Sequence, residues 1–282
     1  MSKDRLKIGV VAPGSPIEPR VADQVKEIAA KLYPDNGPDI HFHPQCFLSW
    51  GHFAGDDETR IQAFLEIAND ERFDALWFAR GGYGSCRLLN TLLRELSDIA
   101  RQKAYLGYSD AGSILAGMYK QGFTRLAHGP MPVDINRNGG AAAIKRALAY
   151  LVEGANESLE SSVSFTTKTA AFNISILSQL IGTPFQPSLS DHILMLEETS
   201  EYMYRIDRSL FHITSNPDIR GVAGIMLGRC GDIPPNDPEF GQTEEQVAQH
   251  WCHVAGIQYL GRADIGHDTE NKVVPFGSLT VK

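Results

Sequence analysis

Residues 103–112 read KAYLGYSDAG, and they are the most informative stretch of the chain. Its apolar part, Lys103–Tyr108, predicts a buried strand, and the residues after Ser109 as far as Met118 predict a helix. A turn from strand directly into helix exposes a hydroxyl and points the first helical N–H groups at whatever is bonded to it. An oxyanion formed at Ser109 would meet the N–H of Asp110. Either residue could also be a plain helix N-cap.

A second turn supports the chemical interpretation of the first. Residues 74–80, DALWFAR, predict the preceding strand, which ends in the glycine loop 81–84, GGYG. Ligands of open α/β sheets bind at the carboxyl ends of the strands, and glycines let the backbone approach a substrate closely. We therefore expect Gly82 to offer an N–H to the same oxyanion as Asp110. The patterns G-x-G-x-x-G and G-x-x-x-x-G-K-[ST] are absent, which disfavours nucleotide binding.

Strands and helices alternate along the first half of the chain. This order predicts an α/β fold with a parallel sheet covered by helices on both faces. Residues 154–170 are polar and rich in Ser and Thr, which predicts a crossover between domains. We therefore expect a first domain at 1–153 and a second, smaller, mixed α/β domain at 171–282. The predicted strands are 6–12, 39–43, 74–80, 103–108, 192–198 and 221–228, and the predicted helices are 20–32, 59–69, 86–93, 110–118, 141–153, 203–214 and 243–255.

The composition excludes several classes of function. The 282 residues carry a formal net charge of −8 and no basic run, so nucleic acid and anionic membrane are not expected partners. The four cysteines form no C-x-x-C pair, which predicts reduced thiols rather than a zinc site or a disulfide framework. No apolar run is long enough for a signal peptide or a membrane span, so a cytoplasmic location is expected.

A serine nucleophile needs a base and a group that orients it. Of the nine histidines, His267 in Gly-His-Asp has the most suggestive setting, and His128 in Ala-His-Gly-Pro is its rival. Glu197 and Glu198 end the apolar strand HILMLEE, which would bring one carboxylate to a strand terminus. A lone pair of glutamates is ordinarily just solvated, so by itself this pattern favours no catalytic role.

One pattern suggests a metal, although weakly. His41 and His43 are spaced so that both imidazoles face one side of a strand. Because no further ligands are apparent, we expect no metal site there.

Taken together, the chain resembles the LD-carboxypeptidase family of serine peptidases, which includes murein tetrapeptide carboxypeptidases and microcin-immunity peptidases. The resemblance extends in order over nearly the whole chain. The matching segments are VVAPGSP (10–16), ARGGYG (79–84), GYSD (107–110), AHGPM (127–131), LIGTPF (180–185), LEE…YRIDRSL (196–210), GRCGD (228–232) and GHDTENKVVPFG (266–277).

The resemblance implies roles for particular residues. Ser109 would be the nucleophile, His267 the base and Glu197 the acid that orients it, with the N–H groups of Gly82 and Asp110 as the oxyanion hole. The implied reaction is release of terminal D-alanine from a murein tetrapeptide in peptidoglycan recycling. A flavodoxin-like N-terminal domain, a swivelling-type C-terminal domain, no cofactor and a homodimer are also implied.

Substrate contacts are less well defined by the sequence. We expect Arg80, next to Gly81, to position the carboxylate of the leaving group, although an ion pair within the domain is an equal possibility. Two positions depart from the family: Gly112 stands where a threonine is usual, and Ala171–Asn173 reads AFN where the family often has GGN. Both departures leave subsite preference open.

Two other functions remain. A microcin-immunity type of peptidase would cleave a peptidyl- or aminoacyl-nucleotide amide with the same three residues, and an aromatic platform for the base would favour it. Trp50, Trp77 and Trp251 are the candidates for that platform. A non-catalytic binding module on the same fold would leave Ser109 unreactive. An ordinary α/β-hydrolase esterase is disfavoured, because the second glycine of G-x-S-x-G is missing after Ser109.

Overall fold

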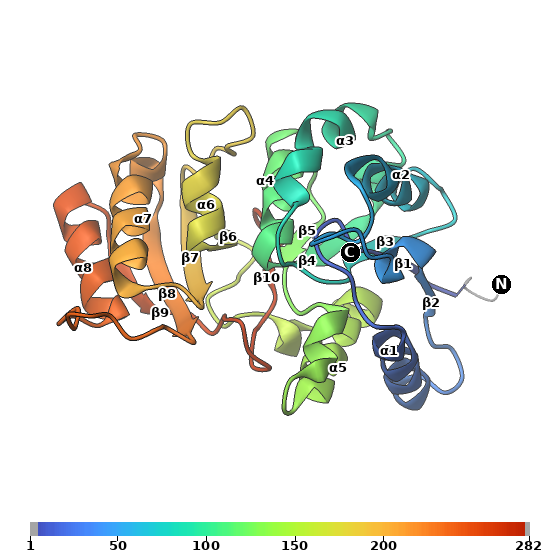
Figure 1. Cartoon of the computed structure of the whole chain (residues 1–282). Coiled ribbons are helices and arrows are strands. Elements are labelled where there is room, and N and C mark those ends of the chain that lie inside the picture. Colours follow the sequence, from blue (N-terminus) through green and yellow to red (C-terminus); the bar gives the residue numbers. More distant parts are fainter. Residues whose placement is uncertain (1–4, 280–282) are drawn as a thin grey trace.

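The computed structural model describes residues 5–279, which form two sheets lying side by side (Figure 1). The first sheet has the strand order β10-β5-β4-β3-β1-β2. All neighbouring strands pair in parallel except β10, which runs antiparallel to β5. Without β10 this is the flavodoxin-like order 2-1-3-4-5, so the predicted fold class is confirmed. The strands are β1 (Lys7–Val11), β2 (Asp39–Phe42), β3 (Ala75–Phe78), β4 (Ala104–Gly107), β5 (Leu126–His128) and β10 (Val274–Pro275).

Helices cover both faces of this sheet, as the nearly continuous apolar strands require. On one face, α1 (Pro19–Leu32) and α5 (Gly140–Glu153) pack against side chains such as Trp77. On the other face lie α2 (Asp57–Ala68), α3 (Leu89–Glu95) and α4 (Gly112–Lys120). Successive residues of a strand point alternately into the apolar cores on the two faces of the sheet. Trp77 faces α1 and α5, whereas Leu76 and Phe78 face the other helices. Figure 1 shows the two helical layers on opposite sides of the strands.

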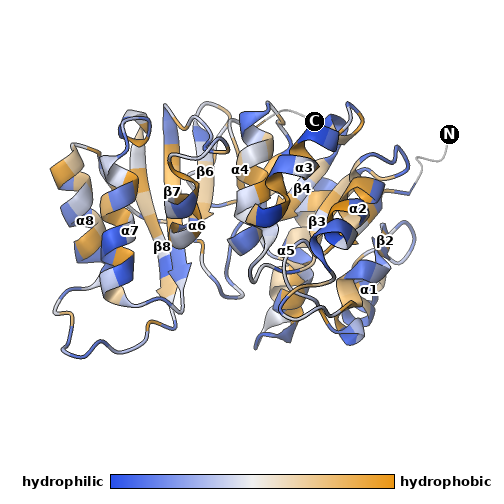
Figure 2. Cartoon of the chain, turned by 45° about the horizontal axis from the view of Figure 1, so that its top comes forward, coloured by the Kyte–Doolittle hydropathy of each residue, from blue (hydrophilic) through white to orange (hydrophobic). Residues whose placement is uncertain are grey.

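The second sheet is parallel throughout, in the order β6-β7-β8-β9. The apolar core beside α4 continues into the helices of this second sheet without a break. In Figure 2 the strands of both sheets are mostly apolar, and hydrophilic residues lie on the outer faces of the helices. The elements are β6 (Lys168–Asn173), α6 (Ile174–Leu180), β7 (His192–Thr199), α7 (Met203–Ser215), β8 (Gly224–Gly231), α8 (Glu244–Ala255) and β9 (Tyr259–Arg262).

Local sequence signals explain where several helices begin. The α2 helix begins after Asp56, whose carboxylate accepts a hydrogen bond from the N–H of Thr59. The α8 helix begins with a capping box between Thr243 and Gln246. Short 3-10 helices connect other elements: η1 (Pro44–Phe47), η2 (Ser85–Leu88), η3 (Ala100–Gln102), η4 (Ser109–Ala111), η5 (Pro132–Asn136), η6 (Asn156–Ser158) and η7 (Ile219–Gly221).

The path of the chain differs from the sequence prediction at two places. Strand β6 begins at Lys168, inside the segment 154–170 predicted as a crossover. Strand β10 lies in the predicted second domain, yet it pairs with β5 and so closes the edge of the first sheet. Because Val274 and Phe276 are buried there, the end of the chain contributes apolar side chains to the core between the two sheets. Within residues 5–279, no helix has the length and apolar character needed to cross a membrane.

Candidate active site

Ser109 follows the carboxyl end of β4 and opens η4, which leads into α4. Its φ of 60° is in the left-handed region, where a residue with a Cβ is strained. The hydroxyl does not cap the helix, since it lies 2.9 Å from Nε2 of His267. The Asp110 carboxylate accepts a hydrogen bond from the N–H of Ser85 instead of capping α4. The plain N-cap explanation of this turn therefore does not hold.

The structure brings together three side chains that the sequence separates widely. The His267 ring bonds Ser109 through Nε2, and its Nδ1 lies 2.5 Å from Oε2 of Glu197. Ser109 comes from the first sheet, Glu197 from β7 of the second sheet, and His267 from the loop after β9. The His267 side chain is 9% exposed and the Glu197 side chain is fully buried. A hydroxyl, an imidazole and a carboxylate in series can carry out nucleophilic acyl transfer.

The charge around His267 favours its protonated form. Burial alone would lower the pKa of the imidazole, but the charge and hydrogen bond of Glu197 outweigh that effect. More distant Glu198 and Asp134 act in the same direction, so the pKa of His267 lies above its ordinary value. This environment stabilises the imidazolium form of the ring.

The two neighbouring glutamates have different surroundings. The Glu198 carboxylate accepts hydrogen bonds from Asn173, from the N–H and hydroxyl of Ser175, and from the N–H of Thr199. It therefore fixes the start of α6. The Glu197 carboxylate bonds His267 through Oε2, and its Oε1 is buried with no hydrogen-bond partner in the described part of the chain. Glu197 is thus the one of the pair that is available to orient the base.

The glycine loop 81–84 packs directly on Ser109. A Cβ built on Gly81 would lie 2.9 Å from Oγ of Ser109 and 3.3 Å from the nitrogen of Asp110, so no larger residue fits. The carbonyl of Gly81 accepts a hydrogen bond from the N–H of Ser15 at 3.1 Å. In a trans peptide the C=O and N–H point in opposite directions, so this bond turns the N–H of Gly82 away from Ser15. Gly82 has a φ of 89°, which glycine adopts freely.

These residues line one cavity of about 630 Å³. Ser109, His267, Gly81, Gly82 and Arg80 all contribute to its wall. Arg80 makes no ion pair within residues 5–279, and its Nη1 donates to the carbonyl of Pro16. Further residues that were not predicted from the sequence line the cavity, although some of them, such as Tyr108 and Met131, lie in the matching segments. The additional lining residues are Tyr108, Met131, Val133, Asp134, Asn136, Arg137, Thr199 and Ser200.

The other histidine candidates are engaged elsewhere. His128 is buried, its Nε2 lies 3.1 Å from Oδ1 of Asn271, and burial lowers its pKa to about 4. It packs against Tyr108, whose ring also contacts His267. His43 accepts a hydrogen bond from the N–H of Gln45 and bonds Glu66. In residues 5–279, no group of three or more His, Cys, Asp or Glu residues is arranged to hold a metal ion.

The three tryptophans lie in three different environments. Trp77 is fully buried beneath the first sheet, where its indole donates to the carbonyl of Pro130. Trp251 packs on Phe211 of α7. Trp50 is 55% exposed and stacks on Phe53, whose ring lies 6.1 Å from that of Tyr83 in the glycine loop. Of the three, Trp50 alone combines an exposed ring with a place near that loop.

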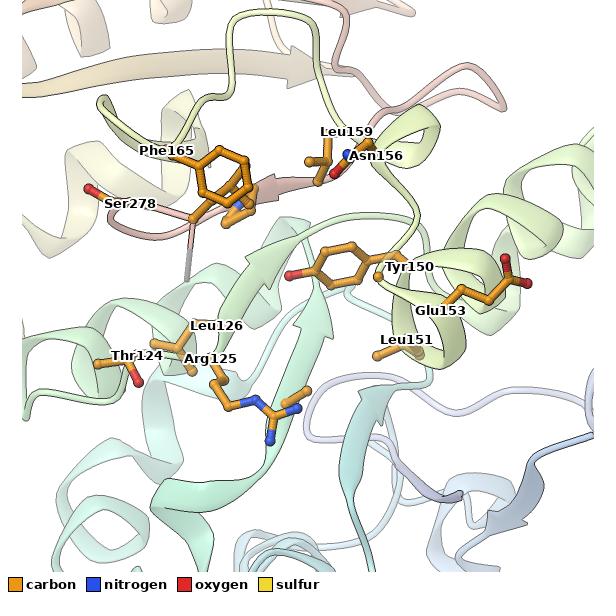
Figure 3. A pocket seen from close by; sticks show the side chains of 14 residues that line it. Thr124, Arg125, Leu126, Tyr150, Leu151, Glu153, Asn156, Leu159, Phe165 and Ser278 are labelled. Carbon is orange, nitrogen blue, oxygen red and sulfur yellow. The ribbon is translucent and has the colours of Figure 1, made fainter. Parts of the chain in front are cut away.

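A second pocket lies away from the three site residues, and Figure 3 shows it from close by. Its cavity of about 270 Å³ is lined by Leu126 of β5, Tyr150 of α5 and Phe165 of the crossover segment, together with other residues. Neither Ser109 nor His267 reaches it. We therefore assign the chemistry to the cavity at the carboxyl ends of the strands, where ligands of open α/β sheets bind.

Two sequence models of the LD-carboxypeptidase family match the chain. The model of the N-terminal domain matches residues 8–129, and the model of the C-terminal domain matches residues 167–281. The murein tetrapeptide carboxypeptidase of Pseudomonas aeruginosa is 24% identical over 98% of this chain and 92% of its own length. A Bacillus subtilis protein named "Probable murein peptide carboxypeptidase" is 26% identical over 96% of this chain and 86% of its own.

Solved structures show the same fold. Muramoyltetrapeptide carboxypeptidase from Oxalobacter formigenes matches with a TM-score of 0.77 at 20% identity, over 95% of this chain and 93% of that one. The microcin C7 self immunity protein MccF, in complex with aspartyl sulfamoyl adenosine, matches with a TM-score of 0.78 at 17% identity, over 96% and 91%. At these identities the structures establish the fold alone. The family models and the fold together define a serine hydrolase built from α/β domains. The chain belongs to the LD-carboxypeptidase family and is a carboxypeptidase of the serine type.

Proposed function

We propose that this enzyme releases terminal D-alanine from a murein tetrapeptide by cleaving the peptide bond between an L-centre and that D-residue, as a step of peptidoglycan recycling. The observation that carries the proposal is the hydrogen-bonded series from Ser109 through His267 to Glu197. The names of the Pseudomonas aeruginosa and Oxalobacter formigenes proteins support the choice of substrate.

The first half of the reaction forms an acyl-enzyme. Oγ of Ser109 attacks the carbonyl carbon of the L-residue while its proton moves to Nε2 of His267. The carbonyl π electrons become the oxyanion, which we assign to the N–H groups of Gly82 and Asp110. The orientation of the Gly81–Gly82 peptide and the closeness of Gly81 to the nitrogen of Asp110 support this assignment. When the oxyanion collapses, the C–N bond breaks, and His267 returns the proton to the departing amine.

The second half restores the enzyme. Water attacks the acyl ester, His267 takes a proton from that water, and the C–O bond to Ser109 breaks as the serine regains its proton. Glu197 holds the imidazole ring in one orientation and stabilises its positive charge in both halves. This chain's own residues supply every proton transfer, and no cofactor takes part in the proposal.

We also propose that Arg80 and Gly81 contact the bound peptide, because both line the cavity beside Ser109. The same proposal divides the chain into a nucleophile-bearing unit, 1–153, and a unit that carries Glu197 and His267, 171–282. The four free cysteines, two of them buried, support action in the reducing cytoplasm. The family resemblance supports a homodimer, which light scattering coupled to size-exclusion chromatography would test.

A direct assay tests the proposed substrate. Purified protein is incubated with a murein tetrapeptide, and D-alanine is measured with D-amino-acid oxidase. We expect release by the wild type and none above background by Ser109→Ala. Parallel incubations with a tripeptide and with an aminoacyl sulfamoyl adenosine test the alternative substrates. Cleavage of the sulfamoyl compound with no release of D-alanine would assign the chain to the microcin-immunity type instead, with exposed Trp50 as the candidate base platform.

A further inference from the structure

Two arginines line the cavity of Ser109, and they come from different segments of the chain. Arg80 precedes Gly81 in the glycine loop, and its Nη1 is drawn to the carbonyl of Pro16 at 3.1 Å. This bond draws the Arg80 guanidinium toward the loop after β1. Arg137 lines the same cavity from the segment after η5.

Arg137 is tied to the side of the site that holds His267. Its Nε donates to Oδ1 of Asp134 at 3.1 Å, and the same oxygen accepts the hydroxyl of Tyr108 at 2.9 Å. The Tyr108 ring in turn lies 4.8 Å from the His267 ring. Asp134 also accepts the N–H of Met131, so this buried carboxylate is held by three donors. Arg137 is thereby fixed in place, while 39% of its side chain stays exposed and it lines the cavity.

The segment that follows Arg137 packs on the loop that carries His267. A Cβ on Gly139 would lie 3.6 Å from the hydroxyl of Thr269, and Arg146 donates from Nη1 to the carbonyl of Thr269 at 2.7 Å. Burial raises the pKa of Asp268, but Arg229 chiefly, and Arg137 more weakly, hold it below its ordinary value. Arg137 is thus close enough to the loop of His267 for its positive charge to lower the pKa of Asp268 in that loop.

The chemistry of the reaction decides which side the terminal carboxylate occupies. His267 must return its proton to the leaving nitrogen, so that nitrogen lies within hydrogen-bond reach of Nε2. In an amino acid the carboxylate carbon is about 2.5 Å from the nitrogen, two covalent bonds away. The free carboxylate of the leaving residue therefore lies on the His267 side of Ser109, away from the glycine loop.

On this basis we propose that Arg137, and not Arg80, binds the terminal carboxylate of the substrate and so makes the enzyme a carboxypeptidase rather than an endopeptidase. This inference rests on the proposed function and deepens it. An arginine fork fits a carboxylate with two parallel hydrogen bonds. Among the described residues 5–279 that line the cavity, Asp134 is the one acidic side chain, and it is already paired.

The test compares two substrates that differ only in the terminal charge. One is the tetrapeptide with a free D-alanine carboxylate, and the other is the same peptide ending in D-alaninamide. The measured quantity is the ratio of their kcat/KM values. In Arg137→Gln we expect kcat/KM to fall about 100-fold for the free acid and by less than about threefold for the amide, because only the charged contact is lost. Arg137→Lys should recover part of the ratio, since it keeps the charge but not the fork.

The matched control is Arg80→Gln, which removes the other arginine of the same cavity. We expect it to leave the acid-to-amide ratio within about threefold of the wild-type ratio. A ratio that collapses in Arg80→Gln, or survives in Arg137→Gln, would overturn the assignment of the carboxylate to Arg137. An equal loss on both substrates in Arg137→Gln would also overturn it, because that pattern reports a damaged site. Failure of the wild type to release D-alanine at all would instead refute the proposed function.

Discussion

At the scale of single residues, Ser109 occupies a backbone conformation that costs free energy. A serine at a φ of 60° is unfavourable by about 1–2 kcal/mol, and it persists because the glycine loop and His267 pack around it. The same conformation turns the hydroxyl toward the imidazole. Strain at this residue and its proposed role as nucleophile therefore have one structural origin.

The sequence predicted this turn well, and the reason is local. The strand, the turn and the helix are contiguous, so their pattern is visible in ten residues. Glu197 and His267 gave much weaker local signals, because a carboxylate pair and a lone histidine have many structural explanations. Their selection depended on the family resemblance. Arg137 was missed altogether, since its position in the cavity is set by Asp134 and Tyr108 and by no motif around it.

Single and combined substitutions of the three site residues should be strongly non-additive. We expect Ser109→Ala and His267→Ala each to lower kcat on the order of a millionfold, and Glu197→Ala about ten-thousandfold. The triple variant should be little worse than the worst single variant, because the residues act as one unit. Steady-state D-alanine release measures this. Losses that multiply across the three sites would mean that they do not form a single catalytic group.

The pH dependence follows from the raised pKa of His267. The base must be neutral to take the proton of Ser109, and a raised pKa means that a higher pH is needed to deprotonate it. The acidic limb of kcat/KM should therefore lie above the ordinary histidine value of about 6.5. In Glu197→Gln the carboxylate charge is removed, so burial becomes the main influence on the pKa of His267 and lowers it. The acidic limb of kcat/KM should therefore move to lower pH. An acidic limb at the same pH in Glu197→Gln as in the wild type would show that Glu197 does not raise the pKa of His267.

At the scale of elements, Arg60 of α2 joins the two loops that approach Ser109. It is 1% exposed, and its Nη1 donates both to the carbonyl of Pro13, after β1, and to the carbonyl of Gly84, after β3. Its Nη2 pairs with Asp57 one turn earlier in the helix. One buried guanidinium thus fixes the distance between two loops. They are the loop after β1, which contacts Gly81, and the glycine loop after β3. The helical periodicity placed this residue on α2 but gave no sign of its role.

Arg60→Leu should therefore affect both stability and turnover. We expect unfolding to become easier by about 3 kcal/mol, because two buried carbonyls lose their donor. We also expect kcat to fall about 10–100-fold as the glycine loop loosens. Urea denaturation and D-alanine release measure the two effects. Arg87→Gln is the matched control: it also removes a partner of Asp57, but that pair is exposed and screened by solvent, so its loss should change stability little. Equal effects of the two substitutions would contradict this role of Arg60.

At the scale of the whole molecule, the site exists only where the two sheets meet. Ser109 comes from the first sheet, and its two partners come from the second half of the chain. Other contacts cross the same junction: Tyr119 of α4 bonds His192 of β7 at 2.7 Å, and β10 closes the edge of the first sheet. The sequence predicted that both halves of the chain are α/β. It did not predict that β10 pairs with the first sheet, because a strand as short as β10 has no periodicity to recognise.

A fragment of residues 1–150 should be inactive even where it folds. It keeps Ser109 but lacks His267, and a serine without a base is a weak nucleophile. It also lacks β10, which leaves β5 as an unpaired edge, so we expect it to be less stable and more prone to aggregation than the full chain. Circular dichroism and D-alanine release measure folding and activity. Turnover by the folded fragment would show that the second half of the chain is dispensable.

Labelling with a fluorophosphonate probe tests the central claim, that His267 activates Ser109, most directly. Peptide mapping by mass spectrometry after brief labelling should place the phosphonyl group on Ser109 in the wild type. His267→Ala should be labelled at least about a thousandfold more slowly, because the hydroxyl loses its base. Arg87→Gln, which does not line the cavity of Ser109, should label like the wild type. Labelling of another serine, or undiminished labelling of Ser109 in His267→Ala, would contradict the account.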